Sequence, residues 1–258
     1  MFACHFTNSA VWDYSVFSYT GVTAAGSSGT NAPGFGNGEV IRKKIVTGND
    51  LNGSVVDGFL FIDFSQPWVL NPNLPVNSVN NAQLDFFATM DHELTHSLGF
   101  GSNIGPDGNS TDPWYSYSKW DQFLTTKNGV RIVDPLTMLV NQMAYEEAQT
   151  NGGLFDGPNA IELWGSKVPL VKSTDISHLD TETFSGGNGF VPINAIMLCC
   201  GGANNQIYVR DYLSAEIGIM ADLGYTRIAA NAVPEPGSLA LLSLGLAGLA
   251  ATRKRKQA

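Results

Sequence analysis

The sequence predicts an α+β fold in which loops make up much of the chain. Only 14% of the 258 residues are charged, 43% are hydrophobic and 28 are Gly, whereas an average globular domain has roughly 25% charged residues. Residues 40–64 contain short apolar runs typical of strands, and residues 81–100 and 211–223 keep helical spacing. This length and hydrophobic content suffice for a sizeable core, arranged as one large domain or as two lobes.

The first regular segment is predicted to be extended. Residues 40–64 favour one or two strands, because apolar residues alternate or cluster there, as in Phe59–Ile62. Three prolines then interrupt regular structure, at Pro67, Pro72 and Pro75.

The strongest helix signal runs from Asn81 to Phe100. It contains no Pro and no Gly before Gly99, and apolar residues recur at helical spacing at Leu84, Phe87, Leu94 and Leu98. Gly99 stands where helices commonly end, because glycine accepts the left-handed conformation of a helix terminus. We therefore predict a helix that is closed by Gly99.

The rest of the chain combines a hairpin with shorter helices. Asn128-Gly129 lies between residues 120–126 and 130–133, which is a strong hairpin signal. Helical spacing predicts three further helices, at residues 136–149, 158–164 and 211–223. The last of these is followed by a closing glycine, Gly224.

The charge distribution excludes one class of partner. The formal net charge is −9, and the last residues include four basic ones, Arg253 to Lys256, so the remainder of the chain is more acidic still. Because phosphate backbones are bound by clustered Lys and Arg, we expect no nucleic-acid binding.

The three cysteines form no disulfide framework. A bridge from Cys4 to Cys199 or Cys200 stays open, as does metal binding by the adjacent pair. The interpretation that we favour for the pair is that of small apolar residues near a buried turn.

The two ends of the chain differ. Residues 1–5 lack the basic and long apolar regions of a secretory signal. Near the other end, Val233–Pro236 precede a charge-free apolar run, Leu239 to Ala251, and the basic cluster follows. The run is shorter than the roughly 20 residues of a spanning helix, but it can cross a thin or locally deformed bilayer.

Pro-Glu-Pro, a short hydrophobic helix and a terminal Arg/Lys cluster together resemble the PEP-CTERM sorting signal of Gram-negative bacteria. The resemblance implies an exported protein whose tail inserts transiently into the membrane and is processed by an exosortase. The mature protein would then reside in the cell envelope or outside the cell. We accordingly divide the chain into a body, residues 1–230, and a sorting tail, residues 231–258. Because export requires an N-terminal signal, we expect the true N-terminus to be missing.

The candidate metal-binding and catalytic residues are predicted to lie on the strong helix, where residues 92–96 read His-Glu-Leu-Thr-His. Side chains four positions apart share a helix face, so His92 and His96 can both reach one Zn²⁺ at about 2.0–2.1 Å. Glu93 then lies beside the metal, where a carboxylate can accept a proton from activated water. Such a match arises by chance in roughly a few per cent of chains of this length.

A catalytic zinc needs a third protein ligand. Residues 92–102 resemble the metzincin pattern HExxHxxGxxH as far as Gly99, but Ser102 stands at the third histidine position, and a hydroxyl is a poor zinc ligand. His178 is followed nineteen residues later by Met197. This order resembles the leishmanolysin-like branch of the metzincins, in which a long insertion precedes the third histidine and a methionine turn.

The leishmanolysin-like resemblance covers about residues 81–225. It implies a metzincin-like α+β fold with a twisted mixed sheet over the active-site helix and an irregular C-terminal lobe that ends in a helix. It also implies His178 as the third ligand, Gly99 as a sharp turn under the metal and Met197 as its floor.

Several alternatives stay open beside this assignment. A carboxylate could replace His178 as the third ligand, and the candidates are Asp107, Asp112, Asp175 and Asp180. His5, the fourth histidine, is expected to be exposed near the start of the chain. Two phenols are candidates for stabilising the tetrahedral intermediate, Tyr208 and Tyr212.

The predicted activity is zinc-dependent endopeptidase cleavage of protein or peptide substrates, with Glu93 as the general base. One alternative is a cell-surface or exopolysaccharide-associated protein that binds zinc without turnover. Glu93 argues against it, because a structural zinc needs no base. The other alternative is a metal hydrolase with a non-peptide substrate.

Overall fold

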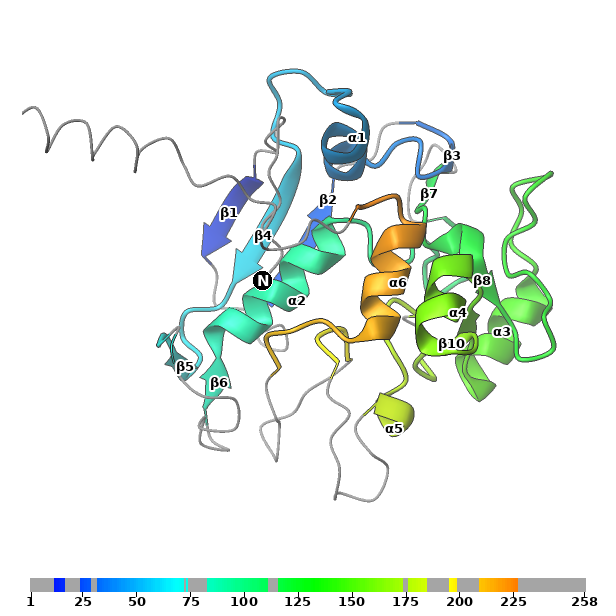
Figure 1. Ribbon diagram of the computed structural model, residues 1–258. Coiled ribbons are helices and arrows are strands. Elements are labelled where there is room, and N and C mark those ends of the chain that lie inside the picture. Colours follow the sequence, from blue (N-terminus) through cyan, green and yellow to red (C-terminus); the bar gives the residue numbers. More distant parts are fainter. Residues whose placement is uncertain are drawn as a thin grey trace, which may run out of the picture. The chain divides into compact units, whose positions relative to one another are not determined.

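The computed structural model describes residues 12–16, 24–28, 32–71, 73, 83–110, 116–173, 176–184, 195–198 and 209–226. These residues belong to one compact unit, Phe6–Thr226, while Met1–His5 and Arg227–Ala258 are assigned to a second unit. The described part is a mixed α/β structure with small sheets and six α-helices (Figure 1). A search of these ranges for membrane-spanning helices finds no candidate.

A mixed three-stranded sheet lies in the N-terminal part of this unit. Its strands are β1 (Trp12–Val16), β4 (Gly58–Ile62) and β2 (Ala24–Ser28), in the spatial order β1-β4-β2. β1 pairs with β4 in parallel, and β2 pairs with β4 in antiparallel register. β2 is therefore an edge strand of this sheet within the described residues.

The predicted extended region 40–64 is only partly a strand. Its first part is helix α1 (Val40–Thr47), which Gly48 closes with a φ of 78°. A strand would direct consecutive basic residues to both faces, whereas a helix lets the buried Arg42 pair with Glu39 one turn earlier, at 2.6 Å. Of the predicted region, β4 is the segment that pairs in a sheet.

The strong helix forms as α2 (Phe86–Ser97), five residues later than predicted. It starts there because the Asp85 side chain accepts hydrogen bonds from the backbone N–H groups of Phe87 and Ala88, at 3.0 and 3.2 Å. The predicted end is confirmed, since Gly99 follows the last turn with a φ of 97°. α2 packs against β2 and β4 and so lies on the mixed sheet (Figure 1).

The other elements are short. There are two pairs of short parallel strands in the described residues. β3 (Gly34–Phe35) pairs with β7 (Ser116–Tyr117), and β5 (Trp68–Val69) pairs with β6 (Leu84–Asp85). A small antiparallel sheet joins β8 (Leu124–Thr125), β9 (Leu154–Phe155) and β10 (Val168–Pro169). The remaining helices are η1 (Asp121–Phe123), α3 (Gln142–Asn151), α4 (Pro158–Trp164), α5 (Thr181–Phe184) and α6 (Ser214–Asp222).

The predictions for this C-terminal part are mostly confirmed, with two corrections. The Asn128-Gly129 turn forms, α4 has the predicted bounds, and α6 begins three residues late. Residues 121–123 are a 3₁₀ helix instead of a strand. Residues 136–140 are not helical, because the Asp134 side chain accepts the N–H groups of Leu136 and Thr137 in a turn, and Asn141 caps α3 instead.

The main hydrophobic core lies in this C-terminal part. It contains fully buried Trp120, Tyr145 and Phe155 and the inner face of α6. Helices α4 and α6 pack closely, since a Cβ at Gly218 would lie 2.5 Å from the Cα of Ala160. Ile196, which contacts His92 in α2, belongs to this core.

Candidate metal centre

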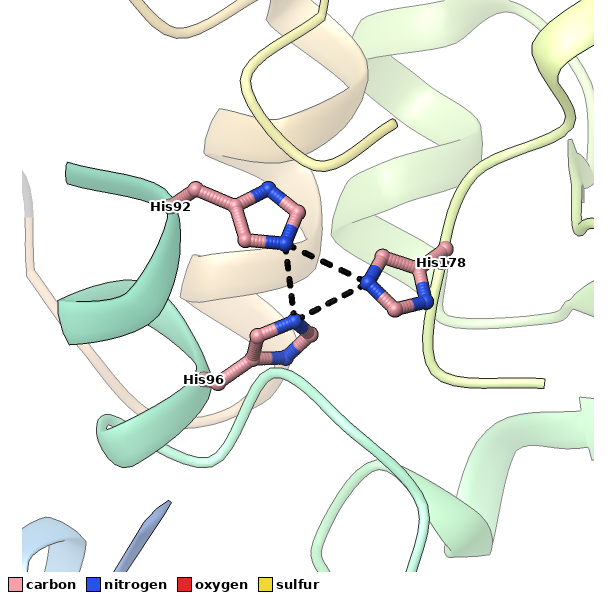
Figure 2. Close-up of side chains that lie close together, drawn as sticks. All are labelled: His92, His96 and His178. Carbon is pink, nitrogen blue, oxygen red and sulfur yellow. Dashed lines mark hydrogen bonds between the residues drawn. The ribbon is translucent and has the colours of Figure 1, made fainter. Parts of the chain in front are cut away.

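Three histidine side chains meet at one point (Figure 2). His92 and His96 project from one face of α2, and His178 comes from a loop 82 positions beyond His96. Their Nε2 atoms are 3.0 Å apart for His92 and His96, 3.1 Å for His96 and His178, and 3.2 Å for His92 and His178. The expected convergence of the three imidazoles, with ring nitrogens about 3–4 Å apart, is therefore observed.

The opposite nitrogens of the two helical imidazoles are held by the backbone. The Nδ1 atom of His92 lies 2.7 Å from the carbonyl oxygen of Ile196, and that of His96 lies 2.7 Å from the carbonyl oxygen of Phe100. A carbonyl oxygen can only accept, so Nδ1 carries the proton in both rings. In the neutral rings, Nε2 is then an acceptor with its lone pair directed at the meeting point.

This arrangement suits a cation. Two bare nitrogens that face each other at 3.0 Å repel, and so do two N–H groups if both rings are charged. A proton can bridge one pair of nitrogens but not all three pairs at once. Zn²⁺ with bonds of about 2.05 Å would place tetrahedral ligand nitrogens about 3.3 Å apart, close to the observed spacing. Within the described residues, these three histidines form the group of side chains that could hold a metal ion.

Glu93 lies beside the cluster and is mostly buried, with 9% of its surface exposed. Burial raises the pKa of its carboxyl to about 7, while a hydrogen bond from the backbone N–H of Gly26 acts in the opposite direction. A divalent cation at the histidines would lower this pKa further. In the absence of a metal, burial therefore lets this carboxyl gain or lose a proton near neutral pH.

A cavity of about 380 Å³ opens over these residues. Its lining includes the whole of β2 together with His92, Glu93, His96 and His178. β2 and α2 are in close contact at Gly26, because a Cβ at this position would lie 2.0 Å from the carbonyl oxygen of Glu93. The cavity therefore exposes an edge strand directly beside the histidine cluster.

Gly99 is required on two grounds. Its φ of 97° belongs to the left-handed region, and a Cβ there would lie 2.6 Å from Oε1 of Glu39. Glu39 is buried under the end of α2, and burial raises the pKa of its carboxyl against the opposing effect of Arg42. The glycine thus lets the chain turn tightly above a buried ion pair.

Ser102, at the third histidine position of the shorter metzincin pattern, has a structural role here. Its hydroxyl donates to Asp121 at 2.6 Å, and its backbone N–H donates to the Ser177 hydroxyl at 3.0 Å. Asp121 also accepts the N–H groups of Asn103 and Ser118, at 3.0 and 2.8 Å. Burial raises the pKa of Asp121 to about 6, although these hydrogen bonds lower it. This network joins the loop after α2 to the residue before His178.

Met197 is fully buried and lies in a turn next to the histidine cluster. Its neighbour Ile196 accepts from His92, and its own carbonyl accepts from the N–H of Leu179, next to His178, at 2.9 Å. Its backbone N–H donates to Glu216 in α6 at 2.7 Å. Burial raises the pKa of Glu216 to about 7. The sequence argument missed Glu216, whose one signal is its place within the last predicted helix, residues 211–223.

The other candidates lie elsewhere. Asp107 binds Asn109, and Asp180 caps α5 through Thr183, so neither belongs to the histidine cluster. The hydroxyl of Tyr212 is hydrogen-bonded to Thr95 and does not line the cavity. Several candidates lie outside the described residues: Cys4, His5, Asp112, Asp175, Cys199, Cys200, Tyr208 and the run Leu239 to Ala251.

Comparison with known proteins identifies the C-terminal tail. Residues 232–256 match the family model of the PEP-CTERM protein-sorting motif. No curated protein and no solved structure matches the chain. The motif marks an exported bacterial protein that an exosortase recognises at its C-terminus and anchors to, or releases from, the cell envelope. The sorting signal and the localisation expected from the sequence are thereby confirmed.

Proposed function

We propose that the protein is a zinc-dependent endopeptidase of the cell envelope, with a site arranged as in leishmanolysin-like metzincins. The observation that carries this proposal is the meeting of three Nε2 atoms at 3.0–3.2 Å, two of them on rings whose Nδ1 atoms face backbone carbonyls. Three neutral imidazoles with an open fourth position are a typical donor set for catalytic zinc. Hydrogen bonds from the far nitrogens fix the tautomer and raise the basicity of the ligands.

The residues then have distinct roles. His92, His96 and His178 would hold Zn²⁺, which supplies a Lewis acid that acidifies water and polarises a carbonyl. Glu93 takes the proton from the attacking water and delivers it to the leaving amine. The Gly26 N–H holds one face of this carboxyl, so that its other lone pairs are directed into the cavity. A purely structural zinc would gain nothing from such a base.

The edge strand favours a peptide over other substrates. β2 lines the cavity along its whole length and pairs with β4 on one side only within the described sheet. An extended peptide can add to such an edge by main-chain hydrogen bonds, which requires no particular side chains. Addition along β2 would bring a peptide bond past Glu93 and the histidine cluster. The small residues of the strand, Ala24 to Ser28, leave room for this approach.

Casein hydrolysis by the purified protein tests the proposal. We expect hydrolysis that a zinc chelator abolishes and that added Zn²⁺ restores. Small ester and amide substrates without an extended backbone serve as the comparison, and they should be cleaved far more slowly. Hydrolysis that survives complete chelation would rule out the zinc mechanism. A preference for the small substrates would favour a non-peptide hydrolase instead.

A further inference from the structure

Glu216 is a buried carboxylate at the start of α6, with none of its surface exposed. Its Oε1 atom accepts the backbone N–H of Met197 at 2.7 Å, and its Oε2 atom accepts that of Leu213 at 2.8 Å. The N–H of Ile196 donates to the same carboxylate. Glu216 therefore binds both residues of the turn that contacts His92.

The same turn contacts two of the three histidine segments. The carbonyl of Ile196 receives Nδ1–H of His92 at 2.7 Å. The carbonyl of Met197 receives the N–H of Leu179, the residue after His178, at 2.9 Å. One carboxylate is thus connected through a two-residue turn to ligands that come from α2 and from the distant loop.

Helix capping alone does not account for the burial of Glu216 or for its hydrogen bond to the turn. A first-turn Glu commonly reaches back to the backbone N–H at the helix start, which here is that of Leu213. That interaction uses one oxygen and needs no burial. Glu216 directs its second oxygen to the turn, and placing a carboxylate in the core is costly unless its hydrogen bonds are required there.

We propose that Glu216 is a positioning residue of the metal centre, which holds the Ile196–Met197 turn so that the Ile196 carbonyl can orient His92. This inference rests on the proposed function, because it assumes that His92 binds a metal. Groups that orient metal ligands affect metal affinity even without touching the ion. The effect should therefore be visible in metal binding, apart from catalysis.

The Glu216→Gln substitution tests this role, because an amide keeps the shape but has one acceptor oxygen. Its NH₂ group must then face either the N–H of Met197 or that of Leu213, and two donors repel. We expect the dissociation constant for Zn²⁺, measured by competition with a chromophoric chelator, to rise roughly 10–100-fold. The visible absorption of the Co²⁺-substituted protein should change as well, because the His92 ring is displaced.

Asp222→Asn is the matched control. Asp222 lies at the other end of α6, is buried to 7% exposure, and accepts the N–H groups of Asn159 and Ala160 at the start of α4. Its loss removes buried hydrogen bonds without touching the turn. We expect this variant to melt at a lower temperature but to keep wild-type Zn²⁺ affinity and the wild-type Co²⁺ spectrum.

The outcomes separate this inference from the proposed function. Wild-type protein that fails to bind Zn²⁺ would refute the proposed function and the role of Glu216 with it. Zn²⁺ binding by the wild type, with equal affinity in Glu216→Gln, would refute the role of Glu216 alone. If Glu216→Gln does not fold, Glu216→Asp replaces it. The shorter side chain keeps the charge but cannot reach both amides, and the same loss of affinity is expected.

Discussion

The Nδ1 atom of His92 donates a hydrogen bond to the carbonyl oxygen of Ile196 at 2.7 Å, across 104 positions of sequence. This contact fixes the tautomer of His92, a proposed metal ligand. The turn that contains Ile196 is itself held by Glu216 of α6. The other helical histidine, His96, finds its acceptor locally, at Phe100. The cluster is therefore held partly by its own helix and partly by distant segments, and the two parts lead to separate predictions.

Glu93→Gln should slow turnover strongly and leave the metal in place. The amide can still accept the N–H of Gly26, so the local packing is retained, but it cannot take a proton from water. We expect kcat to fall about 10²–10⁴-fold while the zinc content stays at the wild-type level. Casein hydrolysis and metal analysis of the same preparation provide the measurement. Wild-type turnover in this variant would show that Glu93 is not the base.

Gly26→Ala should damage the site by steric means. A Cβ at Gly26 would lie 2.0 Å from the carbonyl oxygen of Glu93, and backbone atoms on both sides prevent a simple side-chain adjustment. β2 must move away from α2, so kcat/KM should fall by up to roughly 10²-fold. The free energy of unfolding should decrease by about 1–3 kcal/mol.

Gly153→Ala provides the control for that substitution. Its nearest contact for a new Cβ is 3.4 Å, which is an ordinary packing distance. We expect wild-type kcat/KM for this variant. Equal kcat/KM for Gly26→Ala and the wild type would show that the distance between β2 and α2 does not matter for catalysis.

Asp121→Asn should flatten the pH dependence of stability in metal-free protein. The unfolded carboxyl has a pKa of about 3.9, and burial raises the folded value to about 6. Between these values the folded state binds more protons, so this carboxyl's contribution to stability is full below about pH 4 and is lost as the pH rises through about 6. The wild type should lose roughly 1–3 kcal/mol more than the variant across this window.

Urea unfolding of chelator-treated protein at several pH values from about 4 to 7 measures this difference. Chelation is needed because metal binding has its own pH dependence. Parallel curves for Asp121→Asn and the wild type would show that Asp121 does not retain its proton on folding in this range.

Removal of residues 233–258 should change the localisation of the protein but neither its zinc content nor its peptidase activity. The three histidines and Glu93 all belong to the unit Phe6–Thr226, whereas the sorting motif covers residues 232–256. We expect wild-type zinc content and casein hydrolysis in the purified truncated protein, and loss of exosortase-dependent sorting in cell fractions. Misfolding after truncation would indicate that Leu239 to Ala251 contribute to the core.

Local signals predicted the fold best where one residue decides the structure. Gly99 and the Asn128-Gly129 turn were assigned correctly because their backbone conformations favour glycine. The start of α2 was placed too early, since the apolar spacing continues before the capping residue Asp85. Residues 40–47 were included in the extended region 40–64 because of its apolar runs, although the buried pair of Glu39 and Arg42 fits helical spacing. A single local ion pair of this kind adds nothing to the pattern of apolar residues on which the prediction was based.

The histidine cluster was predictable because it is built from a residue that is rare in this chain. With only four histidines in the chain, the spacing of His92 and His96 and the position of His178 were enough to propose three ligands. The supporting carboxylates were not predictable. Asp121 and Glu216 act through backbone N–H groups that any residue can supply, so the sequence carries no matching partner for them.

Metal stoichiometry tests the central claim most directly. We predict one tightly bound zinc ion per wild-type chain after purification and dialysis, because His92, His96 and His178 supply three nitrogens to one point. His178→Ala should lose this zinc, whereas His5→Ala, which removes the one remaining histidine of the chain, should keep it. A wild-type protein without zinc affinity, or a His178→Ala variant that retains zinc as firmly as the wild type, would contradict the three-histidine centre.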